Sequence, residues 1–403
     1  MLILGIETSC DETAAALLEI TCPLGRRENS SRYVWLRQIS HSETRSREAG
    51  KLEILSNIVS SQIKIHRKYQ GIVPEVAARA HFEKILPVLL ASLSSDQKKT
   101  LAAKKMKGID LIAVTYGPGL VTSLLVGVEA AKTLSYLFKK PLIPVNHLEG
   151  HIYANWLPSF SDFSTSGGSA VALSEGGQTI FPAVCLIVSG GHTELLLMKD
   201  YGGYQRLGGT RDDAAGECFD KAARLLNLGY PGGPVIEGCA SKFKNPCLPV
   251  GRQNSKFKIN LPRPMINQKN FDFSFSGLKT AVLYKTKNTK ISKGLVKALA
   301  YETQESIIDV LIAKTIKAVK GFKAKSVILS GGVAANQRLR DRMKREAEKM
   351  GKIFLVPPKN FCTDNAAMIA TAGYFKYKLL NKKQKKDLLN NWRKVEAEPN
   401  LTL

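Results

Sequence analysis

The chain has 403 residues, 44% of them hydrophobic, and a net charge of +25 from 59 basic and 34 acidic side chains. This length predicts two domains, and the hydrophobic fraction is that of an ordinary soluble globular protein. No run of about 20 apolar residues is present and no basic leader precedes the first strand, so a cytoplasmic, non-membrane protein is expected. The excess of positive charge favours a polyanionic partner such as nucleic acid.

The first half of the chain begins with a predicted strand, turn and strand. Apolar runs at Leu2–Ile6 and Ala14–Ile20 flank the polar turn Glu7–Thr13. The stretch from about 21 to 48 has little periodicity and is interpreted as an insertion, as are 159–180 and 242–258. Helical spacing is expected over Lys51–Ile65 and again over Pro74–Leu90.

A second unit combines a strand, a glycine turn and a helix. The buried-strand pattern Ile109–Thr115 leads into Tyr116–Gly119 and then into the apolar stretch Leu120–Phe138, which has the length of a helix. Such a unit directs backbone amides at a phosphate or packs a helix against a parallel sheet. A short strand, Pro141–Val145, follows directly.

The second half of the chain repeats both units. The repeated segments are the strand-turn-strand Ala183–Ser189, Ser189–Thr193 and Glu194–Met198, and the strand-glycine-helix Ser326–Leu329, Ser330–Gly332 and Ala335–Met350. Two diverged copies of one α/β unit would hold a ligand in the cleft between them.

Three further segments have a predicted conformation. Gly208–Leu226 is expected to be helical after a cap at Thr210. Phe271–Gly277 alternates aromatic and polar residues, which is typical of a strand, and a helix is expected from Leu278. The stretch Phe375–Lys394 predicts a helix whose charge is mostly lysine.

Two histidines, His147 and His151, lie four residues apart just after the predicted strand Pro141–Val145. On a helix this spacing places both imidazoles on one face, where a metal could bind both. Glu149 is two residues from each histidine, so the helical zinc-protease pattern does not fit. The alternative is a polar pair that caps or crosses an interdomain helix.

A third metal ligand is best sought at Asp364, which lies in N-cap position before an apolar helix. Helix capping is the ordinary explanation of such an aspartate. Two histidines and an aspartate are nevertheless a suitable ligand set for iron or zinc that leaves positions open for substrate oxygens.

The paired glycine turns 189–191 and 331–332 indicate either a structural role or a nucleotide site. Their equivalent places in the two halves favour the nucleotide, because amides from facing turns could hold opposite ends of one ligand. Asn336 could then contact ribose or base, and Asp220 and Glu237 could accept ribose hydroxyls; surface solvation is the alternative for both carboxylates.

Eight motifs, in order from residue 3 to about 370, closely resemble the TsaD family of tRNA adenosine threonylcarbamoyltransferases, once named glycoproteases. They are Ile3–Ala15, Gly71–His81, Asn146–Asn155, Ile187–Glu194, Asp212–Lys221 with Tyr230–Pro234, Phe273–Val282, Gly331–Asn336 and Cys362–Ala370. The resemblance implies the actin, heat-shock-70 and sugar-kinase fold, an α/β fold with two duplicated lobes around a cleft. An N-terminal lobe over 1–145 and a C-terminal lobe over 146–370 are expected, with 371–403 packing back on the first lobe.

The resemblance also implies the reaction: transfer of threonylcarbamoyl from threonylcarbamoyl-AMP to N6 of adenosine 37 in tRNAs that read codons beginning with A. It assigns His147, His151 and Asp364 to a divalent metal, Fe²⁺ or else Zn²⁺, and Asp11 and Glu12 to the reacting carbonyl. The adenylate cradle is implied at Ile187, Val188, Ser189, Gly190, Gly191, Asp220, Gly233, Glu237 and Asn336. The implied partners are tRNA, a TsaB-like paralogue and a TsaE-like P-loop ATPase.

Three other functions stay open on the sequence. A metalloprotease would need a general base on the metal face. A kinase or ATPase of the same fold would need a lysine or acid at a phosphate turn. A non-catalytic scaffold would bind the paralogue but hold no metal.

Overall fold

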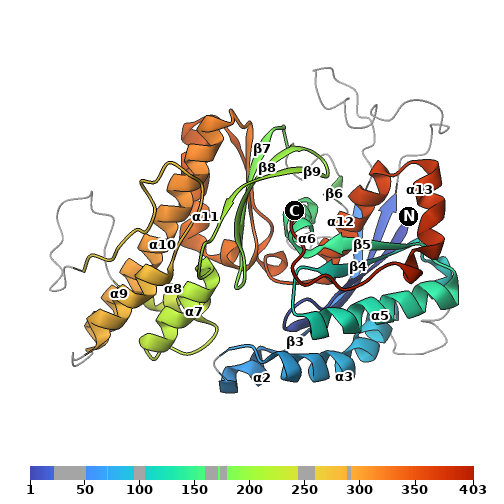
Figure 1. Ribbon diagram of the computed structural model, residues 1–403, viewed down its shortest axis with the longest axis horizontal. Coiled ribbons are helices and arrows are strands. Elements are labelled where there is room, and N and C mark those ends of the chain that lie inside the picture. Colours follow the sequence, from blue (N-terminus) through green and yellow to red (C-terminus); the bar gives the residue numbers. More distant parts are fainter. Residues whose placement is uncertain are drawn as a thin grey trace.

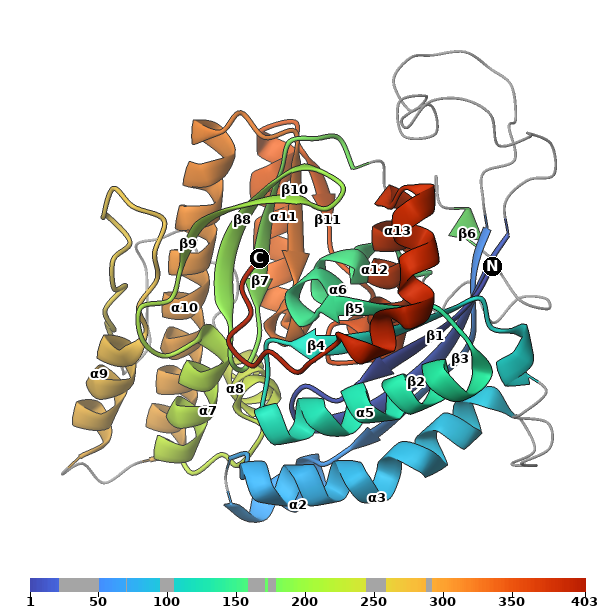
Figure 2. The ribbon, with the colours of Figure 1, turned by 45° about the vertical axis from the view of Figure 1, so that its right-hand side comes forward.

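The computed structural model describes residues 1–21, 51–69, 71–94, 105–158, 171–172, 179–243, 259–287 and 292–403. Two mixed β-sheets stand side by side, with helices between them and on both outer faces (Figure 1, Figure 2). The insertion expected at 21–48 and most of the insertions expected at 159–180 and 242–258 lie outside the described residues.

The first sheet is built from the N-terminal part of the chain. Its strands, in spatial order, are β5 (Leu142–Asn146), β4 (Leu111–Gly117), β1 (Leu2–Glu7), β2 (Glu12–Thr21), β3 (Lys51–Ser61) and β6 (Val171–Ala172). β1 runs antiparallel to β2 but parallel to β4, which in turn runs parallel to β5. The polar turn between β1 and β2 therefore lies at the same edge as the carboxyl ends of β4 and β5.

The second sheet repeats this arrangement. Its order is β11 (Ile353–Leu355), β10 (Ser326–Ser330), β7 (Ala183–Val188), β8 (Thr193–Asp200) and β9 (Gly203–Gly209). β7 is antiparallel to β8 and parallel to β10, which is parallel to β11. β7 thus takes the place of β1 and β10 that of β4, which confirms the internal repeat. The duplicated α/β topology agrees with the two-lobed fold that the resemblance to the TsaD family implied.

The helices form three layers around the sheets (Figure 2). On the outer face of the first sheet lie α3 (Pro74–Leu93) and α5 (Val121–Phe138). Between the sheets lie α6 (His147–Tyr153), which continues as a 3₁₀ turn to Trp156, and α12 (Ala366–Leu379). The outer face of the second sheet is covered by α7 (Ala215–Leu225), α8 (Gly232–Ser241), α9 (Ser276–Thr286), α10 (Lys293–Gly321) and α11 (Gln337–Lys349).

Alternation along the central strands separates the hydrophobic cores. In β7, Cys185 and Ile187 face the inner layer, whereas Leu186 and Val188 face the outer helices, because successive side chains of a strand point to opposite faces. Both faces of the sheet are covered, so β7 is apolar throughout. The inner core contains residues of both sheets, and α6 and α12 belong to it together with β1 and β7. Where one lobe ends and the next begins therefore stays a prediction.

The end of the chain covers the first sheet from outside. After α12, the short helix α13 (Lys382–Asp387) and a 3₁₀ segment (Leu388–Arg393) pack near α5 and β5. The last residues then bond to the carboxyl end of β4 and the turn after it: the Glu398 amide donates to the Tyr116 carbonyl, and the Pro399 carbonyl accepts from the Gly119 amide. The predicted single helix over 375–394 is thus broken around residues 380–381.

Three sequence predictions of local structure are wrong. Lys51–Ser61 is strand β3, not helix. Its apolar spacing is compatible with a helix or a strand, and pairing along the full length of β2 decides in favour of the strand. In 271–277 only Phe273 bridges to another segment, Thr210, so no strand forms. Helix α7 begins at Ala215 rather than after Thr210, and its first amide is bonded by the hydroxyl of Thr193 on β8.

Helix α5 is, by length and composition, apolar enough to cross a membrane, and no other described helix is. In this fold it is a layer of the structure instead. Its Leu124, Val128 and Ala131 are fully buried, and α5 packs against β4 and α3. Only 33% of the helix is buried, so one face of α5 packs against the protein and several apolar side chains of the other face are exposed.

The contact of α12 with β1 depends on the lack of a side chain at Gly5. A Cβ there would lie 2.2 Å from the Ala366 carbonyl oxygen and 3.0 Å from the Ala370 Cβ. We therefore expect Gly5→Ala to lower the free energy of unfolding by about 1–3 kcal/mol, the usual cost of overpacking. Denaturant unfolding followed by circular dichroism measures it.

The matched control is Gly238→Ala in helix α8, where an added Cβ meets no atom within 4 Å. Alanine should be neutral or slightly stabilising there, since it favours the helix. Equal stability of the two variants would contradict the close packing inferred at Gly5.

Candidate active site and metal centre

The two histidines lie at the start of α6, which begins directly after β5. The Asn146 side chain accepts a hydrogen bond from the Leu148 amide and so caps the helix. One helical turn brings the rings of His147 and His151 to a centroid distance of 4.7 Å at an interplanar angle of 77°. Both side chains are buried, at 4% and 1% exposure, so neither imidazole is a solvated surface group.

Asp364 reaches the histidines from the other inner helix. Its Oδ1 lies 3.2 Å from His151 Nε2 and 3.5 Å from His147 Nε2. The sequence placed Asp364 at the N-cap of the following helix, which is wrong: the neighbouring Asn365 caps α12 by accepting from the Met368 amide. Because another side chain does the capping, the Asp364 carboxylate is available to the histidines.

These three side chains can hold one metal ion. One ligand atom from each residue lies within 4.8 Å of the others. Both ring nitrogens of His151 are buried; within the described residues Nδ1 has no hydrogen-bond partner and Nε2 has only the Asp364 carboxylate beside it, an unsatisfied arrangement that coordination would relieve. Two imidazoles and one carboxylate suit Fe²⁺ or Zn²⁺ and leave positions open. The residues therefore fit a catalytic rather than a closed structural metal site.

Glu7 contacts His147 on the side of the ring away from Asp364, a role that was not predicted from the sequence. The Nδ1–H of His147 donates to Glu7 Oε2 at 3.0 Å, which leaves Nε2 free to face Asp364. Glu7 is fully buried at the end of β1 and also accepts from the Ser9 amide and the Thr115 hydroxyl. A carboxylate behind a ligating histidine fixes its orientation and makes it a better donor. The sequence feature that could have indicated this role is an acidic residue at the end of an otherwise apolar strand.

The charges of the centre stabilise one another. Burial raises the pKa of Asp364, but the adjacent His147 and His151 hold it well below its usual range. Burial likewise lowers the pKa of His147, yet Asp364 and Glu7 outweigh it and raise the pKa to about 9. Before a metal binds, the centre is thus an ion pair, and binding must displace a proton from His147.

Asp11 and Glu12 lie beside the centre on the turn between β1 and β2. Their carboxylate oxygens and that of Asp364 lie within 4.8 Å of one another. Burial raises the pKa of Glu12 well above its ordinary value, and the nearby charges of Asp11 and Asp364 add to this. Glu12 therefore tends to keep its proton and can donate a hydrogen bond, whereas Asp11 is the more accessible carboxylate.

Helix α3 holds this turn in place through His81, which is fully buried. Its Nε2–H donates to the Cys10 carbonyl at 3.0 Å, and its Nδ1 accepts from the Thr13 hydroxyl at 2.8 Å. The Gln62 amide donates to the Asp11 carbonyl from the other side. The backbone that carries the two acids is thus fixed at both ends.

The residues proposed for an adenylate cradle come from adjoining segments of the second lobe. Asp220 on α7 accepts from the Gly232 amide beside Gly233, and Glu237 on α8 accepts from the Gln337 amide. Asn336 caps α11 and donates to Gln304. Burial raises the pKa of Asp220 to about 6, partly offset by the Gly232 hydrogen bond.

The glycine turns complete this region. Ser189, Gly190 and Gly191 follow β7, and Gly190 and Gly191 have open space around them. Gly331, after β10, has a φ of +89° and approaches the Val188 carbonyl so closely that a Cβ would lie 2.3 Å away. The side chains of Ile187 and Val188 point into hydrophobic cores, so only their backbone can face a ligand.

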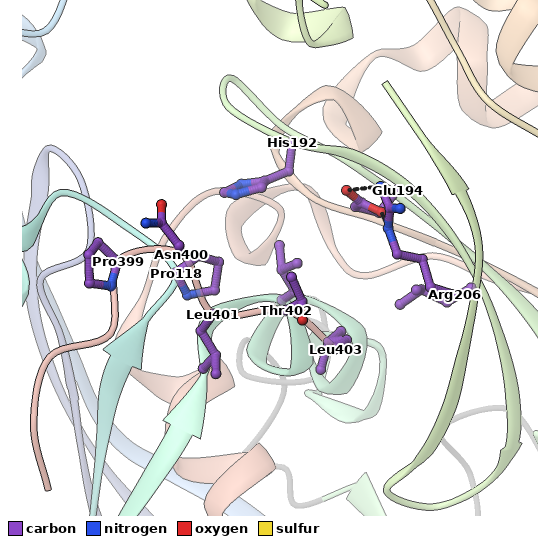
Figure 3. A pocket seen from close by; sticks show the side chains of 11 residues that line it. Pro118, His192, Glu194, Arg206, Pro399, Asn400, Leu401, Thr402 and Leu403 are labelled. Atoms are coloured by element: carbon purple, nitrogen blue, oxygen red, sulfur yellow. Dashed lines mark hydrogen bonds and ion pairs between the residues drawn. The ribbon is translucent and has the colours of Figure 1, made fainter. Parts of the chain in front are cut away.

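A cavity of about 240 Å³ is lined by Leu148, the residue after His147, and by the side chains labelled in Figure 3. Pro118 and residues 399–403 form one wall, and the ion pair of Glu194 with Arg206 lies on the opposite strand side (Figure 3). His192, from the turn after Gly191, lines it as well. Burial lowers the pKa of His192 to about 4, helped by the charges of His147 and His151, so this imidazole is neutral. The sequence analysis identified this turn but did not predict His192 as a site residue.

Comparison with known proteins agrees with this geometry. The family model for TsaD, tRNA N6-adenosine threonylcarbamoyltransferase, matches residues 53–371. The chain belongs to this family. The tRNA N6-adenosine threonylcarbamoyltransferase of Thermodesulfovibrio yellowstonii is 46% identical over 382 residues, covering 94% of this chain and 95% of its own. That of Persephonella marina is 42% identical over 383 residues, covering 94% and 91%.

Among solved structures, full-length HypF in its phosphate- and nucleotide-bound form is 12% identical. It covers 94% of this chain and 46% of its own, with a TM-score of 0.49. As a member of the TsaD family, the chain is a transferase that acts in tRNA modification.

We predict that His151→Ala removes the metal while leaving the fold intact, because the ring makes no hydrogen bond that the fold needs. Loss of one of three ligands should lower metal content in the purified protein from about one per chain to near zero. Elemental analysis measures the metal, and circular dichroism checks the fold.

The matched control is His66→Ala, a buried histidine of the first lobe that bonds to Gln62 and lies outside the metal cluster. It should keep the metal. Full metal occupancy of the His151 variant would remove this residue from the ligand set.

Proposed function

We propose that this chain transfers threonylcarbamoyl from L-threonylcarbamoyl-AMP to N6 of adenosine 37 in tRNAs that read codons beginning with A, with release of AMP. A carbon–nitrogen bond forms between N6 and the carbamoyl carbon, the bond from that carbon to the phosphate oxygen breaks, and N6 loses one proton. The observation that carries the proposal is the juxtaposition of the cluster His147, His151 and Asp364 with the acids Asp11 and Glu12.

The residues of the chain have distinct parts in this proposal. Glycine-turn amides at 189–191 hold the adenylate phosphate, where negative charge grows as AMP leaves. Asp220, Glu237 and Asn336 contact the nucleoside, while Asp11 takes the proton of the weak nucleophile N6 and the protonated Glu12 donates to a carbonyl oxygen. The bound metal, which we infer to be Fe²⁺ with Zn²⁺ as the alternative, would supply Lewis acidity to the threonylcarbamoyl oxygens.

The test supplies purified chain, its partner proteins, tRNA and threonylcarbamoyl-AMP as the sole donor, and detects the modified nucleoside by mass spectrometry. We expect Asp11→Asn to lower the transfer rate by about 100-fold or more, as removal of a proton acceptor does. The control Asp110→Asn changes a carboxylate that accepts from the Leu2 amide at the far end of β1 and should leave the rate unchanged.

Separate assays with other substrates distinguish the alternative functions. Phosphoryl transfer from ATP by this chain without tRNA would favour a kinase, and release of peptides from a glycoprotein would favour the protease. A protein that binds its partners but never modifies tRNA would be a scaffold. Cytoplasmic location follows from the substrate and stays a prediction.

We infer that a TsaB-like paralogue docks on α3 and α5, with a TsaE-like P-loop ATPase joining the complex. Each of these helices presents an apolar pair four residues apart to solvent: Phe82 and Leu86 are 77% and 61% exposed, and Val121 and Leu125 are 47% and 44% exposed. Adjacent helices with such faces are typical of a protein interface. A paralogue with the same fold would offer equivalent helices, which favours it as the occupant.

We predict that Phe82→Glu weakens binding of the paralogue by at least about tenfold, because a charge would be buried in the interface. Isothermal titration calorimetry measures the affinity. The control Leu283→Glu alters a similarly exposed leucine on α9 of the other lobe and should not change it. Equal binding by both variants would place the paralogue elsewhere.

A further inference from the structure

The segment 376–394 carries an unusual concentration of positive charge. It contains one acidic residue, Asp387, and eight basic ones: Lys376, Lys378, Lys382, Lys383, Lys385, Lys386, Arg393 and Lys394. It comprises the last turn of α12, helix α13 and the 3₁₀ segment that follows. In Figure 2 these elements form a surface layer of the first lobe.

Most of this charge has no acidic partner. Within the described part of the chain, six exposed basic side chains form no ion pair: Lys378, Lys382, Lys383, Lys386, Arg393 and Lys394. We call these six residues the lysine face. A run of charges that merely solvates a helix would usually alternate in sign, and this one does not.

Helix α11 provides the internal comparison, because it also carries several basic side chains but has acidic residues among them and beside them. Its Arg338 and Arg342 pair with Glu305, and Arg342 also pairs with Asp309, on α10. Lys344 and Lys349 have acidic neighbours on α11 itself. Four basic side chains of α11 thus lie beside carboxylates, whereas the six residues of the lysine face form no ion pair within the described part of the chain.

The lysine face is also held rigidly. The side chains of Asn381 and Gln384 form a reciprocal cap at the start of α13, and Leu388 is buried against the inner core. Asn391 donates to the Leu142 carbonyl at the start of β5. The backbone of this segment is therefore already ordered in the free protein, which lowers the entropic cost of binding a ligand here.

Aromatic rings lie directly beneath several of the cations. The Lys378 ammonium is 5.5 Å from the Tyr374 ring centre, and the Arg393 guanidinium is 5.0 Å from that of Trp392. Trp392 in turn contacts Tyr136 of α5, over which Lys139 lies at 4.4 Å. Basic side chains interleaved with aromatic ones extend the surface onto the end of α5, a combination suited to nucleic acid.

We propose that the lysine face binds the phosphate backbone of tRNA outside the anticodon loop. The inference rests on the proposed function, since it takes the tRNA to be the substrate of the metal centre. Asp364 precedes the first residue of α12 and the lysine face begins in its last turn. Fourteen helical residues span about 20 Å. An RNA stem whose loop lies at the metal centre can reach across that length.

The test is the triple variant Lys382→Gln, Lys383→Gln and Lys386→Gln, compared with the wild-type chain in filter binding of full-length tRNA at several salt concentrations. Each lost phosphate contact should lower the slope of log K against log salt by about one. We expect a slope smaller by about two to three and at least about tenfold weaker binding at low salt. A short RNA hairpin that contains only the anticodon loop and the adjoining base pairs should bind the variant and the wild-type chain almost equally, because it is too short to reach the lysine face.

The matched control removes three charges from α11: Lys344→Gln, Arg345→Gln and Lys349→Gln. It should bind tRNA almost as the wild type does. An equal loss in both triple variants would overturn the proposal in favour of a general charge effect. Unchanged tRNA binding with lost stimulation by a partner protein would overturn it too, and would assign the lysine face to that protein.

The outcome is separable from that of the proposed function. Lysine-dependent tRNA binding by a chain that never modifies tRNA would support the lysine face and refute the transfer reaction. Normal tRNA modification by a chain whose tRNA binding does not depend on these lysines would support the transfer reaction and refute the role of the lysine face.

Discussion

The contact between helices α6 and α12, enclosed by two sheets, is the constraint on which the site depends. Each helix contributes part of the centre: α6 carries His147 and His151, and Asp364 stands just before α12. Their approach requires Gly150, where a Cβ would lie 2.6 Å from the Ile369 side chain. Because both helices belong to a core shared by the two sheets, the distance between the ligands is set by packing rather than by a flexible loop.

The duplicated topology explains why the chemistry collects at one place. In both sheets a parallel pair of strands ends where the antiparallel hairpin turns, so polar turns of both lobes lie at the corresponding edges. The turn after β1 presents the acids Asp11 and Glu12, and the turn after β7 presents glycine amides and His192. One turn thus carries carboxyl groups, and the other carries backbone amides of the kind that can bind a phosphate.

Beyond the ion pair of His147 with Asp364, the centre and the turn beside it contain an excess of carboxyl groups. Glu7, Glu12 and Asp364 are carboxyl groups at most slightly exposed, and together with Asp11 they surround only two imidazoles. Burying that many acids is costly unless some are protonated or paired with positive charge. The raised pKa of Glu12 is one response, and the raised pKa of His147 is another. A divalent ion would compensate the remaining charge and satisfy His151.

The sequence alone determined the fold class, the internal repeat and the residue types of the site. Repeated strand-turn-strand and strand-glycine-helix units are local patterns, and a histidine pair on one helix face is a consequence of helical periodicity, so both can be read along the chain. The tertiary structure decided what depends on distant partners. Lys51–Ser61 became a strand because β2 was there to pair with it, and Asp364 was released for the centre because Asn365 supplied the cap. Glu7 acquired its role only when the fold placed it behind His147, and Arg338 and Arg342 of α11 found acidic partners only because α10 packs beside them.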